Sequence, residues 1–236
     1  AREEAGFFRW YLDGGYSANE TMGVLRGDIV VPARRFIPPF GVRDAIFNRY
    51  VLSSHHLADR TMPWYVRRMR ESEVRTLAAY PSSAYVLADF MRRTRAEPLR
   101  LAAVFLASES VCEWQRGVIE EFLGPVHAQY GNAERVAWLT TCSAGCYHED
   151  AQYGLVEYFP IGNGMFEIVA TGLVNAAMPL LRYRTGDIAL EPFGFEQYCA
   201  CGRPGPGCKQ IVGRMDDLLV TPDGRKIGRL DHVFKG

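Results

Sequence analysis

The chain has 236 residues, of which 48% are hydrophobic and 12% aromatic, so it can bury a sizeable core in one large domain or two small ones. Its 27 Lys and Arg balance its 27 Asp and Glu, which argues against a basic field for nucleic acid or an anionic membrane surface. No apolar run reaches the roughly 18 residues of a membrane span, and six cysteines are too few for a disulfide-dense secreted domain. These features favour a cytoplasmic protein with reduced thiols.

The first part of the chain predicts helices. Ala1–Arg9 has the pattern of a helix already in progress, and the short apolar pieces that follow it carry little information. From Met62 to Arg95, apolar residues recur at intervals of three and four positions, which is the helical period. The break at Tyr80–Ser83 would end one helix and begin the next. This segment therefore predicts a helical pair.

The next segment predicts a βαβ unit. Leu99–Leu106 is a nearly continuous apolar run, as in the buried strands of parallel sheets. Ala107–Ser110 turns the chain, and Val126–Gln129 has the pattern of the next strand. Between them, Val111–Leu123 predicts a helix with one apolar face that carries Trp114, Val118, Ile119 and Phe122.

After Tyr130 the sequence changes to short strands separated by Gly, Asn and Pro, which predicts an antiparallel sheet or a distorted, partly open barrel. The predicted strands are Val136–Thr140, Gly154–Phe159, Met165–Thr171, Leu180–Tyr183 and Gln210–Val212. Beyond them, residues 216–233 predict a hairpin around a Thr-Pro-Asp-Gly turn. The expected organisation is an α/β part (1–129), a β-rich part (130–212) and the start of a C-terminal domain (213–236).

Four short motifs carry polar chemistry: Ser-Glu-Ser at 108–110, YGNAE at 130–134, RYRTGD at 182–187 and GRMDD at 213–217. Taken alone, each has a plainer interpretation as a turn or a surface ion pair. In this order and spacing, and with the longer matches LLRYRTGDIA and IVGRMDDLLV, they resemble the adenylate-forming enzymes. The resemblance runs from about Tyr80 to the end of the chain. It is strongest to the phenylacetate–CoA ligase branch, including its relatives in capsule and polysaccharide gene clusters.

The resemblance implies a nucleotide site. The backbone around Ser108 and Glu109 would line the adenine, and an aromatic face suits a purine while a carboxylate suits ribose hydroxyls or Mg²⁺. It further implies that Tyr130 stacks on the adenine beside Gly131, which also belongs to the cofactor site, and that Glu134 holds Mg²⁺ against the phosphates. Asp187 would bind the ribose hydroxyls with Arg214 close by, and Asp216 would be a hinge between domains.

The implied reaction is ATP-dependent formation of an acyl-adenylate from a small carboxylic acid, followed by transfer to coenzyme A. Glu134 and Arg214 would be the catalytic residues, and neither nucleic acid nor membrane is an expected partner. In the family, a phosphate-gripping loop would lie before residue 1 and a catalytic lysine beyond Gly236, so we expect a fragment of a longer enzyme. The sequence does not identify the carboxylic acid, the acceptor of the acyl group or the oligomeric state, and a homodimer is one possibility for the last. Two alternatives are a noncatalytic nucleotide- or zinc-binding relic and a zinc-stapled interaction domain.

The cysteines form a second pattern. Cys142 and His148 lie six positions apart around Gly145, and a Cys-x-Cys pair, Cys199 and Cys201, follows after about fifty residues. Three thiolates and one imidazole make a closed tetrahedral set of the structural zinc type. Some phenylacetate–CoA ligase relatives carry a similar set with bound metal, which adds to the prediction. Cys146 and Cys208 are spare candidates that could replace a named zinc ligand, and their plainer interpretations are a buried thiol and a loop thiol. Cys112 is expected to be part of the core, and His55–His56 to be structural or solvated.

Overall fold

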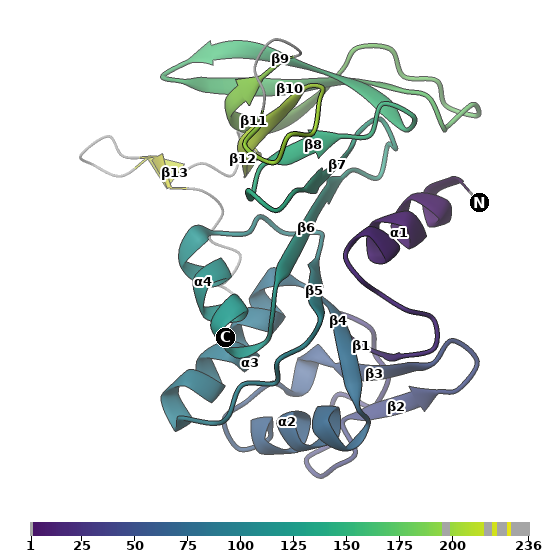
Figure 1. Ribbon diagram of the computed structural model, residues 1–236, viewed down its shortest axis with the longest axis vertical. Helices are drawn as coiled ribbons and strands as arrows, with labels where there is room; N and C mark the ends of the chain where they lie inside the picture. Colours follow the sequence, from purple (N-terminus) through teal and green to yellow (C-terminus); the bar gives the residue numbers. More distant parts are fainter. Residues whose placement is uncertain (1, 195–198, 215–218, 221–225, 228–236) are drawn as a thin grey trace. The chain divides into compact units, whose positions relative to one another are not determined.

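The computed structural model describes residues 2–194, 199–214, 219–220 and 226–227 (Figure 1). The chain divides into two compact units. The α/β unit is Phe7–Ala128, and the β-rich unit comprises Ala1–Gly6 together with Gln129–Gly236. The α/β class predicted from the sequence is confirmed.

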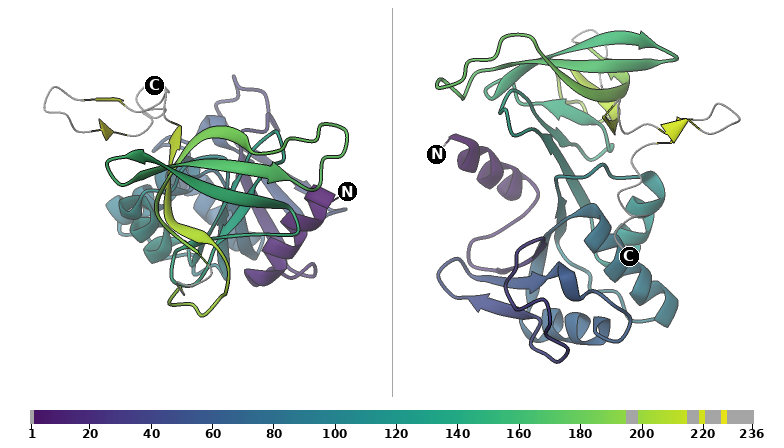
Figure 2. Two further views of the ribbon diagram at one scale, coloured as in Figure 1. Left: turned by 90° about the horizontal axis from the view of Figure 1, so that it is seen from above. Right: turned by 180° about the vertical axis from the view of Figure 1, so that it is seen from behind.

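The α/β unit is built on a mostly parallel sheet with strand order β2-β3-β1-β4-β5-β6 (Figures 1 and 2). Only β2 and β3 pair antiparallel, whereas β3, β1, β4, β5 and β6 form parallel pairs in that order. The strands are β1 (Thr21–Arg26), β2 (Gly41–Asp44), β3 (Arg49–Ser53), β4 (Val74–Ala79), β5 (Ala103–Leu106) and the first half of β6 (Val126–Gly131). The helices are α1 (Arg2–Asp13), the short η1 (Ser54–His56), α2 (Met62–Glu71), α3 (Pro81–Thr94) and α4 (Glu113–Phe122).

Strand β4 corrects the predicted helical pair. The first helix ends at Glu71, and the chain turns through Glu73, which has a left-handed φ of 48°. All of β4 except Arg75 is then buried between β1 and β5. A short apolar run has the same composition in a buried strand and in a buried helix, so its periodicity does not separate them. The predicted break at Tyr80 is confirmed as the start of α3.

The predicted βαβ unit is confirmed as β5, α4 and β6. The four residues of β5 are completely buried. Helix α4 buries Gln115, Ile119 and Phe122, whereas Trp114 is 59% exposed, so its place on the predicted apolar face was wrong. Trp114 instead contacts Tyr85 of α3 edge to face, at 4.8 Å between ring centroids, because α3 and α4 lie side by side.

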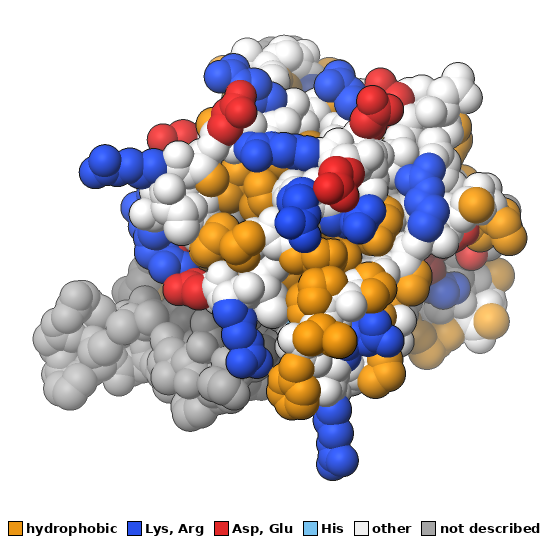
Figure 3. Space-filling model, turned by 90° about the horizontal axis from the view of Figure 1, so that it is seen from below, with side chains coloured by type: hydrophobic (Ala, Val, Ile, Leu, Met, Phe, Trp, Pro, Cys, Tyr) orange, Lys and Arg blue, Asp and Glu red, His pale blue; other side chains and the backbone are white. Residues whose placement is uncertain are grey.

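One face of the α/β unit exposes apolar side chains. Figure 3 shows hydrophobic side chains gathered among Lys and Arg side chains on the face seen from below. In this unit the guanidinium of Arg49 lies over the Phe47 ring at 4.5 Å, and that of Arg60 lies over the Phe36 ring at 5.9 Å. The largest exposed apolar residues between positions 29 and 47 are Ile29, Phe36, Ile37, Ile46 and Phe47.

The β-rich unit is an antiparallel sheet of order β6-β7-β8-β12-β11-β10-β9, in which the second half of β6 pairs with β7. The remaining strands are β7 (Trp138–Thr141), β8 (Tyr147–Glu149), β9 (Gly154–Gly162), β10 (Met165–Gly172), β11 (Tyr183–Phe193) and β12 (Gly207–Arg214). Strand β8 was not predicted, and β11 lies later and is longer than the predicted Leu180–Tyr183. Cys208 lies in β12 and is fully buried, which corrects its assignment to a loop.

The predicted hairpin near the end of the chain is present in its described part, where β13 (Leu219–Val220) pairs antiparallel with β14 (Lys226–Ile227). The turn between these strands lies outside the described residues. Within the described part of the chain, no helix is long and apolar enough to cross a membrane.

Candidate nucleotide site and metal centre

The Ser-Glu-Ser turn lies in the α/β unit, directly after β5. Because β4 and β5 are parallel, their carboxyl ends share one edge of the sheet, which is where open α/β sheets bind ligands. Ser108 and Ser110 are exposed there. Ser108 has a φ of 73°, a left-handed conformation that costs a residue with a side chain about 1 kcal/mol or more. The turn is therefore a strained loop at a ligand-binding edge.

Glu109 has both carboxylate oxygens occupied. The Ser82 backbone N–H donates to its Oε2 at 2.9 Å, and the Ser82 hydroxyl donates to its Oε1 at 3.0 Å. Ser82 lies in the first turn of α3. The Glu109 carboxylate thus binds the N-terminus of α3, which leaves the backbone of its loop as the part predicted to line the adenine.

The other nucleotide-binding candidates lie in the β-rich unit. The Tyr130 hydroxyl, from β6, donates to Asp187 Oδ2 on β11 at 2.6 Å. Arg214 lies opposite Asp187 in the β11–β12 pairing, with its Nε 3.8 Å from Asp187 Oδ1. Asp187 is 9% exposed, whereas Arg214 is largely exposed. Three residues from three separate motifs thus form one cluster.

Thr185 fixes the backbone at Asp187. Its hydroxyl donates to the Ile168 carbonyl at 2.8 Å and accepts the Asp187 backbone N–H at 3.0 Å. Gly186 between them has a φ of 72°, so a glycine suits this position. The Thr-Gly-Asp sequence therefore holds the Asp187 carboxylate in one orientation.

The electrostatics of this cluster are dominated by burial. Burial raises the pKa of Asp187, and the Tyr130 hydrogen bond and the Arg214 charge only partly oppose that effect. Burial also raises the pKa of Tyr130 well above its usual range, and the neighbouring Asp187 carboxylate adds to the shift. Tyr130 consequently stays a neutral hydroxyl donor, and its hydrogen bond favours the ionised Asp187.

Glu134 is held by a residue that sequence reasoning missed. The Tyr183 hydroxyl donates to Glu134 Oε1 at 2.9 Å, and this bond raises the pKa of Tyr183. The turn that presents Glu134 is closed by Asn132, whose Oδ1 accepts the Val136 N–H at 3.1 Å. Glu134 is only partly buried, so its donor set of carboxylate oxygens fits a hard cation such as Mg²⁺. Gly131, the last residue of β6, is exposed beside this turn.

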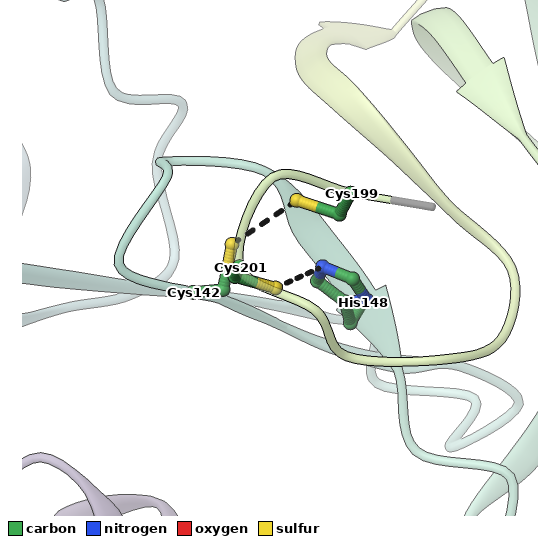
Figure 4. A group of neighbouring side chains, drawn as sticks. All are labelled: Cys142, His148, Cys199 and Cys201. Atoms are coloured by element: carbon green, nitrogen blue, oxygen red, sulfur yellow. Dashed lines mark hydrogen bonds between the residues drawn. The ribbon is translucent and has the colours of Figure 1, made fainter. Parts of the chain in front are cut away.

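The predicted metal ligands converge within the β-rich unit (Figure 4). Cys142 Sγ and Cys199 Sγ are 3.7 Å apart, and Cys201 Sγ and His148 Nε2 are 3.5 Å apart. All four ligand atoms lie within 4.8 Å of one another. A tetrahedral site with metal–sulfur bonds of about 2.3 Å has edges of about 3.8 Å, so the two shorter separations match that geometry. The donor set of three sulfurs and one imidazole fits zinc.

Local backbone bonds shape the two arms of this cluster. In the first arm, the Gly145 N–H bonds the Cys142 carbonyl at 2.9 Å, and in the second the Gly202 N–H bonds the Cys199 carbonyl at 2.9 Å. Both glycines have left-handed φ angles, 78° and 76°. The arms are joined because β8, which carries His148, pairs with the start of β12. Cys146 is partly buried rather than buried, and it is not one of the four clustered ligands.

The histidine pair and Cys112 have structural surroundings. His56 is buried, its Nδ1 is 2.8 Å from the Ser53 hydroxyl, and its ring stacks on Phe40 at 5.2 Å. His55 Nε2 is 3.3 Å from the Gly27 carbonyl. Cys112 caps α4, where its N–H bonds Gln115 Oε1 at 3.1 Å.

Sequence reasoning located the motifs but not the side chains that support them. Tyr183, Thr185 and Ser82 act through hydrogen bonds to residues far away in the sequence, which spacing does not reveal. Tyr183 and Thr185 lie inside the RYRTGD motif, so that motif was the available signal. Asp216, the predicted hinge, lies outside the described residues.

No protein-family model matches the sequence. Over 201 residues the chain is 25% identical to Protein CapK of Staphylococcus aureus, which covers 83% of this chain and 43% of CapK. Over 160 residues it is 30% identical to phenylacetate-coenzyme A ligase of Thermus thermophilus, covering 61% of this chain and 35% of the ligase. The chain thus spans less than half the length of the curated relatives it matches.

Solved structures show the same fold. A structure of 2-hydroxyisobutyryl-CoA ligase in the postadenylation state, bound to R3-HIB-AMP, matches 92% of this chain and 48% of its own, with a TM-score of 0.64 and 18% identity. A second structure of that ligase, with 2-HIB-AMP, matches 93% of this chain and 50% of its own with a TM-score of 0.62. The chain therefore has the fold of these CoA ligase structures, and its sequence is similar to CapK and to phenylacetate–coenzyme A ligase.

Proposed function

We propose that the full-length protein containing this chain activates a carboxylic acid with ATP and then transfers the acyl group to the thiol of coenzyme A. The observation that carries this proposal is the Tyr130–Asp187–Arg214 cluster, in which a buried carboxylate is held by a 2.6 Å tyrosine hydrogen bond beside an exposed guanidinium. The similarity to phenylacetate-coenzyme A ligase, and the fold shared with ligase structures bound to acyl-AMP molecules, support this proposal.

The proposed first step forms an acyl-adenylate. A carboxylate oxygen of the acid attacks the α-phosphorus of ATP, the bond from that phosphorus to the bridging oxygen breaks, and pyrophosphate leaves. Asp187 accepts hydrogen bonds from the ribose hydroxyls, and Arg214, which extends into solvent, binds developing phosphate charge. Mg²⁺ held by Glu134 would neutralise further negative charge on the phosphates. Positioning and charge neutralisation therefore account for the catalysis, without a protein nucleophile.

The proposed second step transfers the acyl group. The sulfur of coenzyme A attacks the acyl carbonyl carbon, AMP leaves, and the thiol proton passes to solvent. In this proposal Tyr130 and Gly131 keep the adenosine bound through both steps, and the glycine leaves the adenine beside Tyr130 unobstructed. The four-ligand Cys and His cluster takes no part in the chemistry, because four protein ligands leave no open position on a zinc ion.

The test is acid-dependent release of pyrophosphate by the full-length protein, measured with ATP and a panel of aliphatic, hydroxy and aryl carboxylic acids. We expect at least one acid to give turnover, and coenzyme A to convert the product into a thioester detectable by mass spectrometry. Asp187→Ala should raise the KM for ATP by about tenfold or more, because a charged hydrogen-bond partner worth about 1.5–3 kcal/mol is lost. Arg182→Ala, which removes an exposed pairing with Glu157 outside the cluster, is the matched control and should leave that KM unchanged.

ATP binding without pyrophosphate release from any acid would instead favour a noncatalytic nucleotide-binding protein. Binding of zinc without any ATP binding would favour an interaction domain. Either result contradicts the proposed ligase.

A further inference from the structure

The negative charge of the Glu109 carboxylate is unexpected at its position in the chain. It lies in a loop proposed to receive a nucleotide, where a free negative charge would repel phosphate. The carboxylate instead binds Ser82, because both of its oxygens accept hydrogen bonds from that residue, at 2.9 and 3.0 Å. Ser82 lies 27 positions earlier in the chain, so the contact joins two separate elements of the α/β unit.

Helix α3 lacks a cap of its own. Its N-cap residue, Tyr80, makes no side-chain capping bond, and Pro81 has no N–H to donate. The orphan Ser82 N–H is therefore satisfied by Glu109, and the carboxylate also meets the positive end of the α3 dipole. The first turn of α3 contains no acidic residue that could take this role.

The conformation of the loop that carries Glu109 must be stabilised by contacts from outside the loop. Ser108 is in a left-handed conformation and is exposed, as is Ser110. A backbone held away from its preferred region persists only where the surroundings determine it. On its far side, the chain is fixed by the Cys112–Gln115 bond that begins α4. On its near side, β5 ends at Leu106. The hydrogen bonds between Glu109 and Ser82 thus fix the middle of the loop.

We propose that Glu109 is a positioning residue: it clasps the Ser108–Ser110 loop to the first turn of α3, so that the loop backbone is ordered before the nucleotide base arrives, and its carboxylate does not contact the nucleotide. This inference rests on the proposed function, and it assigns Ser82 to the same task.

The clasp predicts a specific kinetic pattern in the full-length protein. Glu109→Ala should raise the KM for ATP by about tenfold, because the loss of both bonds frees the loop, while the KM for the acid stays the same. Ser82→Ala keeps the backbone bond and should raise the KM for ATP by roughly threefold. The double variant should be no worse than Glu109→Ala alone, since both changes remove one interaction. Glu109→Gln, which retains an oxygen acceptor for the Ser82 N–H, should restore part of the affinity.

A matched control separates positioning from general stability. Thr94 lies at the opposite end of α3, where its hydroxyl bonds the Phe90 carbonyl at 2.8 Å. Thr94→Val should lower the melting temperature without a change in the KM for ATP. Hydrogen exchange followed by mass spectrometry supplies a second readout, in which Glu109→Ala and Ser82→Ala should speed exchange in the peptide that covers residues 107–112.

The outcomes are distinguishable. If the wild-type protein releases no pyrophosphate with any acid, the proposed function fails. If the wild type is active, but Glu109→Ala and Ser82→Ala leave the KM for ATP and the exchange of residues 107–112 unchanged, the clasp is wrong. An additive double variant would show that Ser82 and Glu109 act separately, and would also overturn it.

Discussion

The two units of the chain differ in whether they bury carboxylates. In the α/β unit, β5 and nearly all of β4 bury apolar residues, and the largest fully buried side chains, Tyr65, Phe40 and Phe105, lie there as well. Among the described residues, the α/β unit also buries polar side chains such as Thr76 and Gln115, but both buried carboxylates, Glu167 and Asp187, lie in the β-rich unit. A buried apolar side chain is stabilised by leaving water, whereas a buried polar one is tolerated only when it has a partner. The first unit should therefore respond to changes in volume and the second to loss of partners.

The largest expected effect is loss of metal from the β-rich unit. The described parts of its two ligand-bearing arms are short in apolar residues, so we propose that one zinc ion orders them. Cys142→Ser should lower the free energy of unfolding by more than about 3 kcal/mol, because metal binding to a structural site is also folding free energy. Elemental analysis should find one equivalent of zinc in the wild type and much less in the variant. Hydrogen exchange should accelerate across residues 138–150 and 199–212.

Cys112→Ser is the control for the metal prediction, since that thiol lies in the α/β unit at the start of α4. It should keep full zinc content, and the exchange of residues 138–150 should not change. A wild-type protein without zinc, or a Cys142→Ser variant as stable as the wild type, would contradict the proposed site. The order of the two ligand-bearing arms would then need a cause other than metal binding.

The second effect concerns the buried carboxylate of Glu167. Glu167 is 4% exposed, and Arg184, which is mostly exposed, binds it through two nitrogens, with Nε 2.9 Å and Nη2 2.5 Å from Oε2. Arg184→Gln leaves a carboxylate buried without its cation and should cost about 2–3 kcal/mol, whereas Glu167→Gln leaves only an exposed guanidinium and should cost less. Urea unfolding of both single variants and the double variant measures this asymmetry.

The pair would be an ordinary surface salt bridge if Arg184→Gln and Glu167→Gln lowered the free energy of unfolding equally. The same would follow if the loss in the double variant equalled the sum of the two single losses. Arg182→Gln is the matched control, because Arg182 and Glu157 form a pair in which both side chains are substantially exposed. Its expected cost is below about 1 kcal/mol.

The two units also differ in how well their secondary structure could be predicted from the sequence. Strand β5, helix α4 and strand β6 were predictable because a continuous apolar run followed by a helical period has few other solutions. Strand β4 was missed, since a buried strand after a helix continues the same apolar composition. In the β-rich unit, β8 was missed because Tyr147–Glu149 is only three residues long and is defined by its pairing with β7 and β12.

The candidate site was predictable at the level of motifs. Tyr130, Asp187 and Arg214 come from motifs whose order resembles that of adenylate-forming enzymes, and the structure brings them together. The spacing of Cys142, His148, Cys199 and Cys201 likewise predicted one cluster. Their supporting residues were not predictable, because the Tyr183–Glu134 and Ser82–Glu109 bonds depend on tertiary structure. The same dependence explains why the sequence placed Glu109 in the loop but did not predict the partner of its carboxylate.

The smallest effect is a gain in stability at Asp187. Burial raises the pKa of this carboxyl in the folded protein, and the nearby Glu134 charge adds to the shift, while Tyr130, Thr185 and Arg214 oppose it. The folded state therefore binds a proton at Asp187 more readily than the unfolded state does. For a raised pKa, the stability that this group contributes is present at acid pH and is lost as the pH rises through the folded value. Asp187→Asn removes this dependence.

The Asp187→Asn variant should thus gain stability relative to the wild type as the pH rises from acid to neutral, although it binds ATP more weakly. Thermal unfolding of both proteins across that range measures the difference, with Asp89→Asn as the control because arginine pairing lowers the pKa of Asp89 despite some desolvation, so its contribution has the opposite sign. A melting difference at Asp187 that is constant with pH, or that falls as the pH rises, would show that Tyr130 and Arg214 fully compensate the buried charge. Such compensation would make Asp187 resemble the satisfied pair at Glu167. The predicted rise would instead mark it as a carboxylate kept ionised for its ligand at a cost to the fold.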